Sequence, residues 1–239
     1  RSSDLCLLTY INYNNKIQMT DGHSLLSPIL LIGVLMAKIA NKEEKRNTIA
    51  LASIKLFSEK GFQKTSIDEI ARSAGVAKGT IYLYFKNKEE IIFAIWDIIT
   101  KQHELIFNEK IKPEMSSKEK ILIYYNFRDL ENYYNKEQLL VLFQEFVSAL
   151  LIDKTKLYTD YFENFFQKDY DFISTCLYEG VEKKEFLIDD IEFLTNTIII
   201  LLKGILIKAK VSNMCFDEVQ EILTKHIIYL LEKCTQENL

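Results

Sequence analysis

One short run of the sequence, residues 78–85 (KGTIYLYF), gathers a lysine, a threonine and two tyrosines around a glycine. Ile81 and Phe85 lie four residues apart, so on a helix they share one face, which we expect to point inward. The opposite face then carries Lys78, Gly79, Tyr82 and Leu83. An α-helix fits the major groove of B-DNA, where base edges present distinct hydrogen-bond donors and acceptors. The run therefore predicts a helix that contacts DNA.

The first three residues of this run each have an expected contact. Lys78 has the reach for a guanine edge or a phosphate, and Gly79 permits close approach of the backbone. Thr80 can donate a hydrogen bond to a phosphate, and its methyl group can contact a thymine methyl. Because phosphate contacts position a protein without reading sequence, we expect specificity to come from the few base contacts.

Three further residues are candidates for phosphate contacts because they lie at predicted helix starts, where free amides favour anions. Thr65 and Ser66 precede one short helix, and Lys88 precedes the long helix that follows the run. Each has a simpler alternative, since Thr65 or Ser66 could act only as a helix cap and Lys88 only as a surface lysine. Basic residues expected near the DNA backbone or a minor groove also occur earlier in the chain, at Lys42, Lys45 and Arg46.

The elements that must position these residues are helices. The i, i+3, i+4, i+7, i+8 spacing of one helix face is followed by Ile49, Ala52, Ser53, Leu56 and Phe57. Gly61 is suited to end that helix, because a residue without Cβ tolerates a left-handed conformation. Ser66 and Glu69 have the spacing of a capping box at the start of the next helix, which Gly75 ends. Two short helices joined by a glycine turn predict a helix-turn-helix.

The charge of the chain is unevenly distributed. The net charge of −4 argues against a nucleic-acid binder when it is taken over all 239 residues. Residues 36–88, however, carry 11 basic and 5 acidic residues, a net +6, while residues 89–239 carry 17 and 27, a net −10. A basic segment that coincides with a helix-turn-helix is typical of a DNA-binding module.

The chain resembles the TetR (tetracycline-repressor) family of bacterial transcription regulators. The resemblance extends from Ile49 to Ile91 and rests on Gly61-Phe62, Thr65-Ser66-Ile67, Ala74-Gly75-Val76, Lys78-Gly79-Thr80-Ile81-Tyr82 and Tyr84-Phe85. It implies that the Tyr82 and Tyr84 hydroxyls contact phosphates. Ala77 stands where the family often has Ser, so the recognition helix lacks a side-chain cap. The remainder of the chain matches the family only in its helical layout.

From the resemblance we expect an all-α protein with a three-helix DNA-binding domain at residues 36–88. Residues 89–239 would form a helical ligand-binding and dimerisation domain. The family pairs its last two helices with those of a second copy, binds a palindromic operator as a homodimer, and is usually released from it by a small-molecule effector. Repression is the usual outcome, and activation is an alternative. Two other possibilities stay open: a protein in place of the small effector, and a helical module that no longer binds DNA.

Periodicity predicts that the second domain is built from long helices. Their expected ranges are 88–111, 117–134, 136–151, 155–183, 190–211 and 217–234. Segment 190–211 is apolar on nearly every side, which is more apolar surface than the core of one monomer needs. The residues responsible are Ile198, Ile199, Leu201, Leu202, Ile205 and Leu206. An apolar stripe marks the last helix, and Gly204 and Ala209 would allow close helix approach. These features predict the dimer interface.

Aromatic residues are frequent in residues 124–172, which suits either an effector pocket or ordinary core packing. They are Tyr124, Tyr125, Phe127, Phe143, Phe146, Tyr158, Tyr161, Phe162, Phe165, Phe166, Tyr170 and Phe172. Such a pocket would suit an apolar or cationic ligand, although the sequence does not identify its lining. Trp96 lies on the helix expected to link the two domains, where a packing change could reach the DNA-binding head.

No enzyme chemistry is apparent in the sequence. The four cysteines include no CxxC pair and the three histidines are isolated, so we expect no catalytic site, metal site or cofactor. Leu25–Ala37 is too short for a membrane span, and we expect a cytoplasmic protein. We interpret Met36 as the native start and residues 1–35 as an extension or expression remnant, the alternative being a genuine N-terminal arm.

Overall fold

The structure is a computed structural model that describes residues 28–235, with side chains from residue 36 onward. The chain divides into two units, residues 1–42 and 43–239, and each is described by itself. Within the first, the described part belongs to helix α2 (Pro28–Lys60), whose side chains are exposed from Met36 to Lys42. Helix α2 runs through residue 36 without a break, so the proposed boundary at Met36 stays a prediction. The expectations for residues 1–27 fall outside the described part of the chain.

The second unit begins with the predicted helix-turn-helix. The remainder of α2 is followed by α3 (Ile67–Ser73) and α4 (Lys78–Tyr84). Gly61 ends α2 with φ +82° and Gly75 forms the turn between α3 and α4 with φ +64°, a region of the backbone map that favours glycine. The predicted capping box is present, because the Ser66 hydroxyl accepts from the Glu69 amide and the Glu69 side chain accepts from the Ser66 amide.

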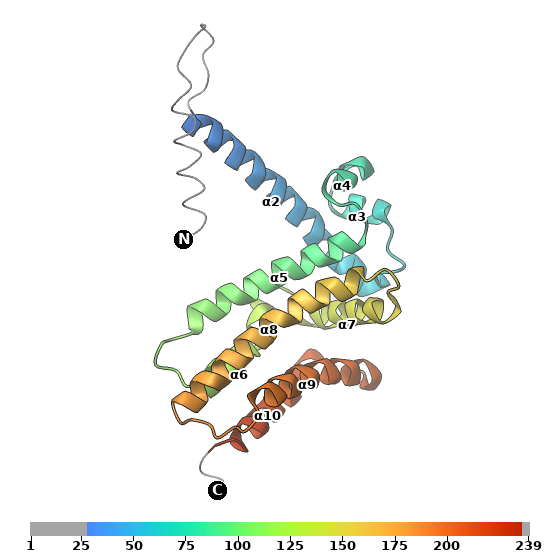
Figure 1. The fold of residues 1–239 in the computed structure, drawn as a ribbon. Helices are drawn as coiled ribbons and strands as arrows, with labels where there is room; N and C mark the ends of the chain where they lie inside the picture. The colour runs from blue at the N-terminus through green and yellow to red at the C-terminus, as the bar shows by residue number, and fades with distance from the viewer. Residues whose placement is uncertain (1–27, 236–239) are drawn as a thin grey trace. The chain divides into compact units, whose positions relative to one another are not determined.

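The remainder of the second unit is helical as well, and residues 28–235 contain no strand. Its elements are α5 (Glu89–Lys110), α6 (Ser117–Tyr124), the 3-10 helix η1 (Phe127–Asn132), α7 (Lys136–Ile152), α8 (Leu157–Glu182), α9 (Ile191–Ser212) and α10 (Phe216–Glu232) (Figure 1). The all-α expectation is confirmed, and five of the six long helices begin and end within two residues of the predicted bounds.

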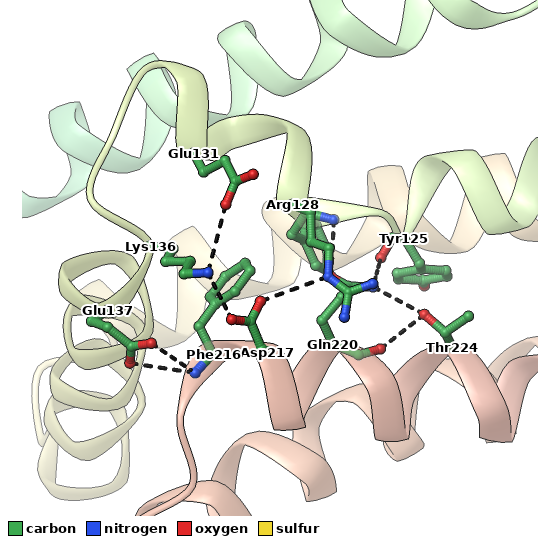
Figure 2. A network of polar contacts seen from close by, with 10 residues as sticks. Tyr125, Arg128, Glu131, Lys136, Glu137, Phe216, Asp217, Gln220 and Thr224 are labelled. Atoms are coloured by element: carbon green, nitrogen blue, oxygen red, sulfur yellow. Dashed lines mark hydrogen bonds and ion pairs between the residues drawn. The ribbon is translucent and has the colours of Figure 1, made fainter.

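The exception is the predicted helix 117–134, which the structure breaks after Tyr124. Gln220 on α10 holds the break open: its Nε2 donates to the Tyr125 carbonyl at 2.8 Å, and its Oε1 accepts from the Phe127 amide at 3.0 Å (Figure 2). These backbone groups would otherwise continue a helix, so a buried tertiary partner overrides the local periodicity.

Two apolar clusters form the core of residues 43–235. One joins α2, α3 and α4 to α5, α7 and the start of α8, and the other joins α6, the end of α8, α9 and α10. Phe127 and Phe166 pack against both clusters. The helix-turn-helix therefore shares one continuous core with helices of the second predicted domain, and shape changes there can be passed between close-packed side chains.

Candidate functional site

Helix α4 presents the face that the sequence predicted. Ile81 and Phe85 are buried in the core, whereas Lys78, Gly79 and Tyr82 are exposed and Leu83 is 74% exposed. Thr80 and Tyr84 are half-buried at the edges of this face. The structure thus brings the candidate base-reading residues together on one short helix, and no element of residues 28–235 covers its outer face.

The start of α4 is the weak point of this helix. Ala77 offers no side-chain cap, as expected, so the first amides of α4 have no side-chain acceptor. The Lys78 ammonium lies 2.8 Å from the Asp68 carboxylate of α3, and this contact raises the pKa of Lys78. Lys78 therefore stays charged, although its charge is shared with an acid on the same surface.

Thr65 and Ser66 differ in what they can contact. Ser66 is exposed and caps α3, so its predicted phosphate contact is compatible with its position. Thr65 is only 2% exposed, and its hydroxyl donates to the Gly61 carbonyl at 2.9 Å. In this arrangement the Thr65 side chain braces the loop between α2 and α3, and its contact with a phosphate stays a prediction.

The Lys88 side chain is also turned toward the protein. Its ammonium donates to the carbonyls of Phe62, Gln63 and Thr65 at 2.7, 3.2 and 3.0 Å. The same ammonium lies 4.5 Å from the centre of the Phe62 ring, and burial lowers the pKa of Lys88. Lys88 ties the α2–α3 loop to the start of α5, so a phosphate would have to compete with three carbonyls for it.

A cavity of about 140 Å³ lies within the second unit, lined by residues of α5, η1 and α6–α10. Five of the aromatic residues singled out in the sequence line it, namely Tyr124, Phe127, Phe143, Phe165 and Phe166, and so does Trp96. Others of that set, including Phe146, Tyr158 and Phe162, are ordinary core residues. Apolar, aromatic walls with few polar groups are typical of small-molecule sites.

Asp169 on α8 is the buried acid of this cavity, with 9% of its surface exposed. The Tyr124 hydroxyl donates to its Oδ1 at 2.5 Å. Burial raises the pKa of Asp169 to about 6, so the carboxyl group is mostly ionised at neutral pH.

Two more polar side chains face the same space. Burial lowers the pKa of His103, so its ring is neutral at physiological pH. The His103 ring packs against Tyr124 and Phe127 with centroid distances of 5.2 and 5.3 Å. The Trp96 indole N–H is buried and has no hydrogen-bond partner among the described residues.

Helix α7 connects the cavity with the helix-turn-helix. Phe143 lines the cavity and meets the Trp96 ring edge-on at 5.5 Å. Half a turn further on, the Glu145 carboxylate accepts from the Phe62 amide at 3.0 Å, at the point where α2 ends. A β-carbon at Gly61 would lie 3.1 Å from the same carboxylate, so the fit is close.

Burial divides the apolar residues of α9 into two sets, and the predicted dimer interface stays a prediction. Ile198, Ile199, Leu202, Ile205 and Ala209 are buried in this chain's own core, so Ala209 is not free to approach a second copy. The exposed stripe consists instead of Phe193, Ile200, Ile207 and Val211, with Gly204 open between them. The apolar residues of α9 thus lie on two faces, one buried in the core and one exposed. A helix that is apolar all round does not show from its sequence which residues lie on which face.

Glu145, Asp169 and Gln220 were not singled out from the sequence. Each has a polar neighbour, Gln144, Lys168 and Glu221 respectively, so no local pattern distinguishes them from surface residues. The described residues contain no group of His, Cys, Asp and Glu that could hold a metal ion. Within the same part of the chain, no helix is long and apolar enough to cross a membrane.

Comparison with known proteins identifies the helix-turn-helix. A family model described as "Bacterial regulatory proteins, tetR family" matches residues 49–95. The fatty acid metabolism regulator protein of Bacillus subtilis (strain 168) is 38% identical over 82 residues, which are 34% of this chain and 42% of that protein. The sequence match therefore spans less than half of this curated relative.

Solved structures extend the likeness to the whole fold. A TetR transcription regulator from Haloarcula marismortui superposes with a TM-score of 0.68 at 16% identity, over 81% of this chain and 99% of the other. The transcriptional regulator FadR from Bacillus subtilis, solved with stearoyl-CoA, gives 0.63 at 24% identity, over 77% and 96%. Residues 49–95 therefore carry the DNA-binding sequence of the TetR family of bacterial regulatory proteins, and the chain shares the helical fold of solved TetR regulators.

Proposed function

We propose that the protein is a dimeric, ligand-responsive DNA-binding regulator, most simply a repressor that a small molecule releases from a palindromic operator. The observation that carries this proposal is the uncovered face of α4, with Lys78, Gly79, Tyr82 and Leu83 exposed on a segment of net charge +6. A repressor of this kind would act in the cytoplasm, where its DNA is.

The DNA contacts divide into reading and bracing roles. Lys78, Gly79 and Thr80 at the start of α4 would meet base edges and nearby phosphates, and the hydroxyls of Tyr82 and Tyr84 would meet the backbone. Ser66 would add a phosphate contact at the α3 start. Thr65 and Lys88 would act through the α2–α3 loop that they hold.

We assign the dimer contact to the exposed stripe of α9. Ile200 is 66% and Val211 is 78% exposed, and large apolar side chains in line along one helix favour burial against a partner. Gly204 leaves room for close approach of a second helix. A charge placed in this stripe, Ile200→Glu, is expected to give monomers in analytical ultracentrifugation, whereas Leu105→Glu on the exposed face of α5 leaves a dimer. A dimer in both variants would contradict the assignment.

We place the effector in the cavity and its signal on α7. A ligand that changes the packing of Phe143 would shift α7, and Glu145 on the same helix holds the Phe62 amide at the end of α2. The ligand lowers DNA affinity only if it binds more tightly to the protein conformation that binds DNA less well. DNA then lowers the affinity for the ligand by the same factor. FadR from Bacillus subtilis, which has a similar fold, was solved in complex with stearoyl-CoA, so a small-molecule ligand is compatible with this fold.

The test of DNA binding uses duplexes selected from random sequence and fluorescence anisotropy. The wild-type protein is expected to bind selected DNA with a steep salt dependence. Lys78→Ala should weaken binding about tenfold or more and relax specificity, because each good base contact contributes roughly 1–3 kcal/mol. Lys101→Ala removes the same charge from an exposed position on α5 and should leave the affinity unchanged.

Two results would refute the DNA-binding role. One is the selection of no sequence by the wild-type protein, as expected for a helical module without DNA binding. The other is an equal effect of both lysine substitutions. Selective DNA binding without any response to small molecules would instead favour a protein effector.

A further inference from the structure

The carboxylate of Asp169 lacks the partners that a buried charge requires. Its Oδ1 accepts from Tyr124, but its Oδ2 has no hydrogen-bond donor within the described chain. None of the ion pairs among residues 36–235 includes Asp169. A buried charge without a counter-ion is costly, and protein cores normally avoid it.

Two lysines, Lys168 and Lys203, lower the pKa of Asp169 through their charge, but each contacts another group. Lys168, next in sequence, lies 3.5 Å from Glu104, and both of these side chains are at least half exposed. The Lys203 ammonium lies 3.8 Å from the centre of the Phe166 ring, and burial lowers its pKa. Neither lysine forms an ion pair with Asp169, so the carboxylate keeps its capacity for a cation.

The walls around Asp169 favour the same type of ligand. The rings of Tyr124 and Trp96 line the cavity, and aromatic rings attract cations. His103 is neutral and adds no positive charge. Lys168 also lines the cavity, but its ammonium is paired with Glu104. An anionic ligand would therefore meet the buried like charge of Asp169 and a cation that already has an acidic partner.

The size of the cavity sets a limit on the ligand. At about 140 Å³ it is comparable to a cavity that holds one benzene molecule. A single ring or a short branched chain would fill it, with one charged group directed at Asp169.

We propose that Asp169 is the anionic anchor of the effector cavity and that the effector is a compact organic cation, an amine with an apolar body of about one ring. The proposal rests on the proposed function, because it names the ligand class of the same cavity. An ammonium group would donate to Oδ2 and complete the ion pair that the protein itself lacks.

The test compares three molecules of matched size: phenethylammonium, phenylpropionate and phenethyl alcohol. Each is titrated into the full-length protein by isothermal calorimetry at about pH 7.5, where the amine is charged and Asp169 is ionised. We expect the amine to bind at least about tenfold more tightly than the carboxylate, because a charge-assisted contact contributes about 1.5–3 kcal/mol. Equal binding, tighter binding of the carboxylate, or binding of neither overturns the proposal.

One variant and one control locate the effect. Asp169→Asn should remove the preference for the amine, and Asp171→Asn, on an exposed turn of the same helix, should retain it. A preference that survives in Asp169→Asn, or is lost in Asp171→Asn, would also overturn the proposal.

DNA binding is measured separately, without ligand, on the same preparations. A protein that prefers the amine but binds no DNA would refute the proposed regulatory function and support the cation site. Selective DNA binding together with a carboxylate preference would refute the cation site and leave the regulator.

Discussion

Replacing Asp169 by asparagine should stabilise the folded protein at neutral pH. The substitution removes the negative charge of a residue that is only 9% exposed. It keeps a side-chain oxygen that can accept a hydrogen bond from the Tyr124 hydroxyl. A residue kept for ligand binding at the expense of stability is a known trade-off in functional sites. The change in stability therefore tests whether the Asp169 carboxylate is strained in the unliganded protein.

The magnitude follows from the pKa of Asp169, which burial raises from 3.8 to about 6. The folded state then holds its proton more tightly than the unfolded state, so the ionised form opposes folding. The contribution of this one carboxyl to stability is most favourable below about pH 4 and is lost as the pH rises to about 6. Two pH units at about 1.4 kcal/mol each give a loss of roughly 3 kcal/mol at neutral pH. The charged and hydrogen-bonding groups that act on this carboxyl are Tyr124, Lys168 and Lys203.

Urea denaturation at a fixed protein concentration measures this effect, since the stability of a dimer depends on concentration. Asp169→Asn should raise the free energy of unfolding by about 2–3 kcal/mol at pH 7.5, and the gain should shrink toward zero near pH 4. Asp171→Asn should show neither the gain nor its pH dependence. An Asp169→Asn protein that is no more stable at pH 7.5, or a gain independent of pH, would refute the reasoning.

Three further predictions concern other parts of the molecule. Asp68→Asn releases Lys78 from its ion pair and removes an acid beside it, so DNA affinity should rise several-fold with a steeper salt dependence, as measured by anisotropy. Glu145→Ala leaves the Phe62 amide without its acceptor, so that amide should lose protection in hydrogen exchange and ligand-induced release of DNA should weaken. Gly180→Ala puts a β-carbon into an aromatic ring of the α8–α9 loop and should lower stability by about 1–3 kcal/mol in urea denaturation.

The DNA-binding head was the part most fully predicted from sequence, because its signals are local. The Ser66–Glu69 capping box, Gly61 and Gly75 each depend on residues within one turn, and the structure contains all three as expected. The same holds for the inward face of α4, since the spacing of Ile81 and Phe85 fixes it.

What the sequence could not provide depends on residues far apart in the chain. Gln220 breaks the helix after Tyr124 from a distance of 95 positions, and no local pattern announces such a partner. Likewise, the roles of Lys88 and Thr65 depend on the carbonyls that they meet in the folded loop. A lysine at a helix start looks the same in sequence whether it faces a phosphate or its own chain.

The division of the apolar residues of α9 between core and surface could not be predicted for a related reason. An almost wholly apolar helix indicates two buried faces but does not say which face meets the chain's own core. Only the packing of α8 and α10 against α9 distinguishes Ile199, which is buried, from Ile200, which is exposed.

Hydroxyl-radical footprinting of the protein on a selected DNA duplex tests the central claim most directly. Two copies of α4 should protect two patches related by a two-fold axis, with centres about 34–36 Å apart along the duplex. Tyr82→Ala should weaken protection within both patches without moving them. A single protected patch, or protection without a fixed position on the sequence, would contradict a dimer that reads DNA through α4.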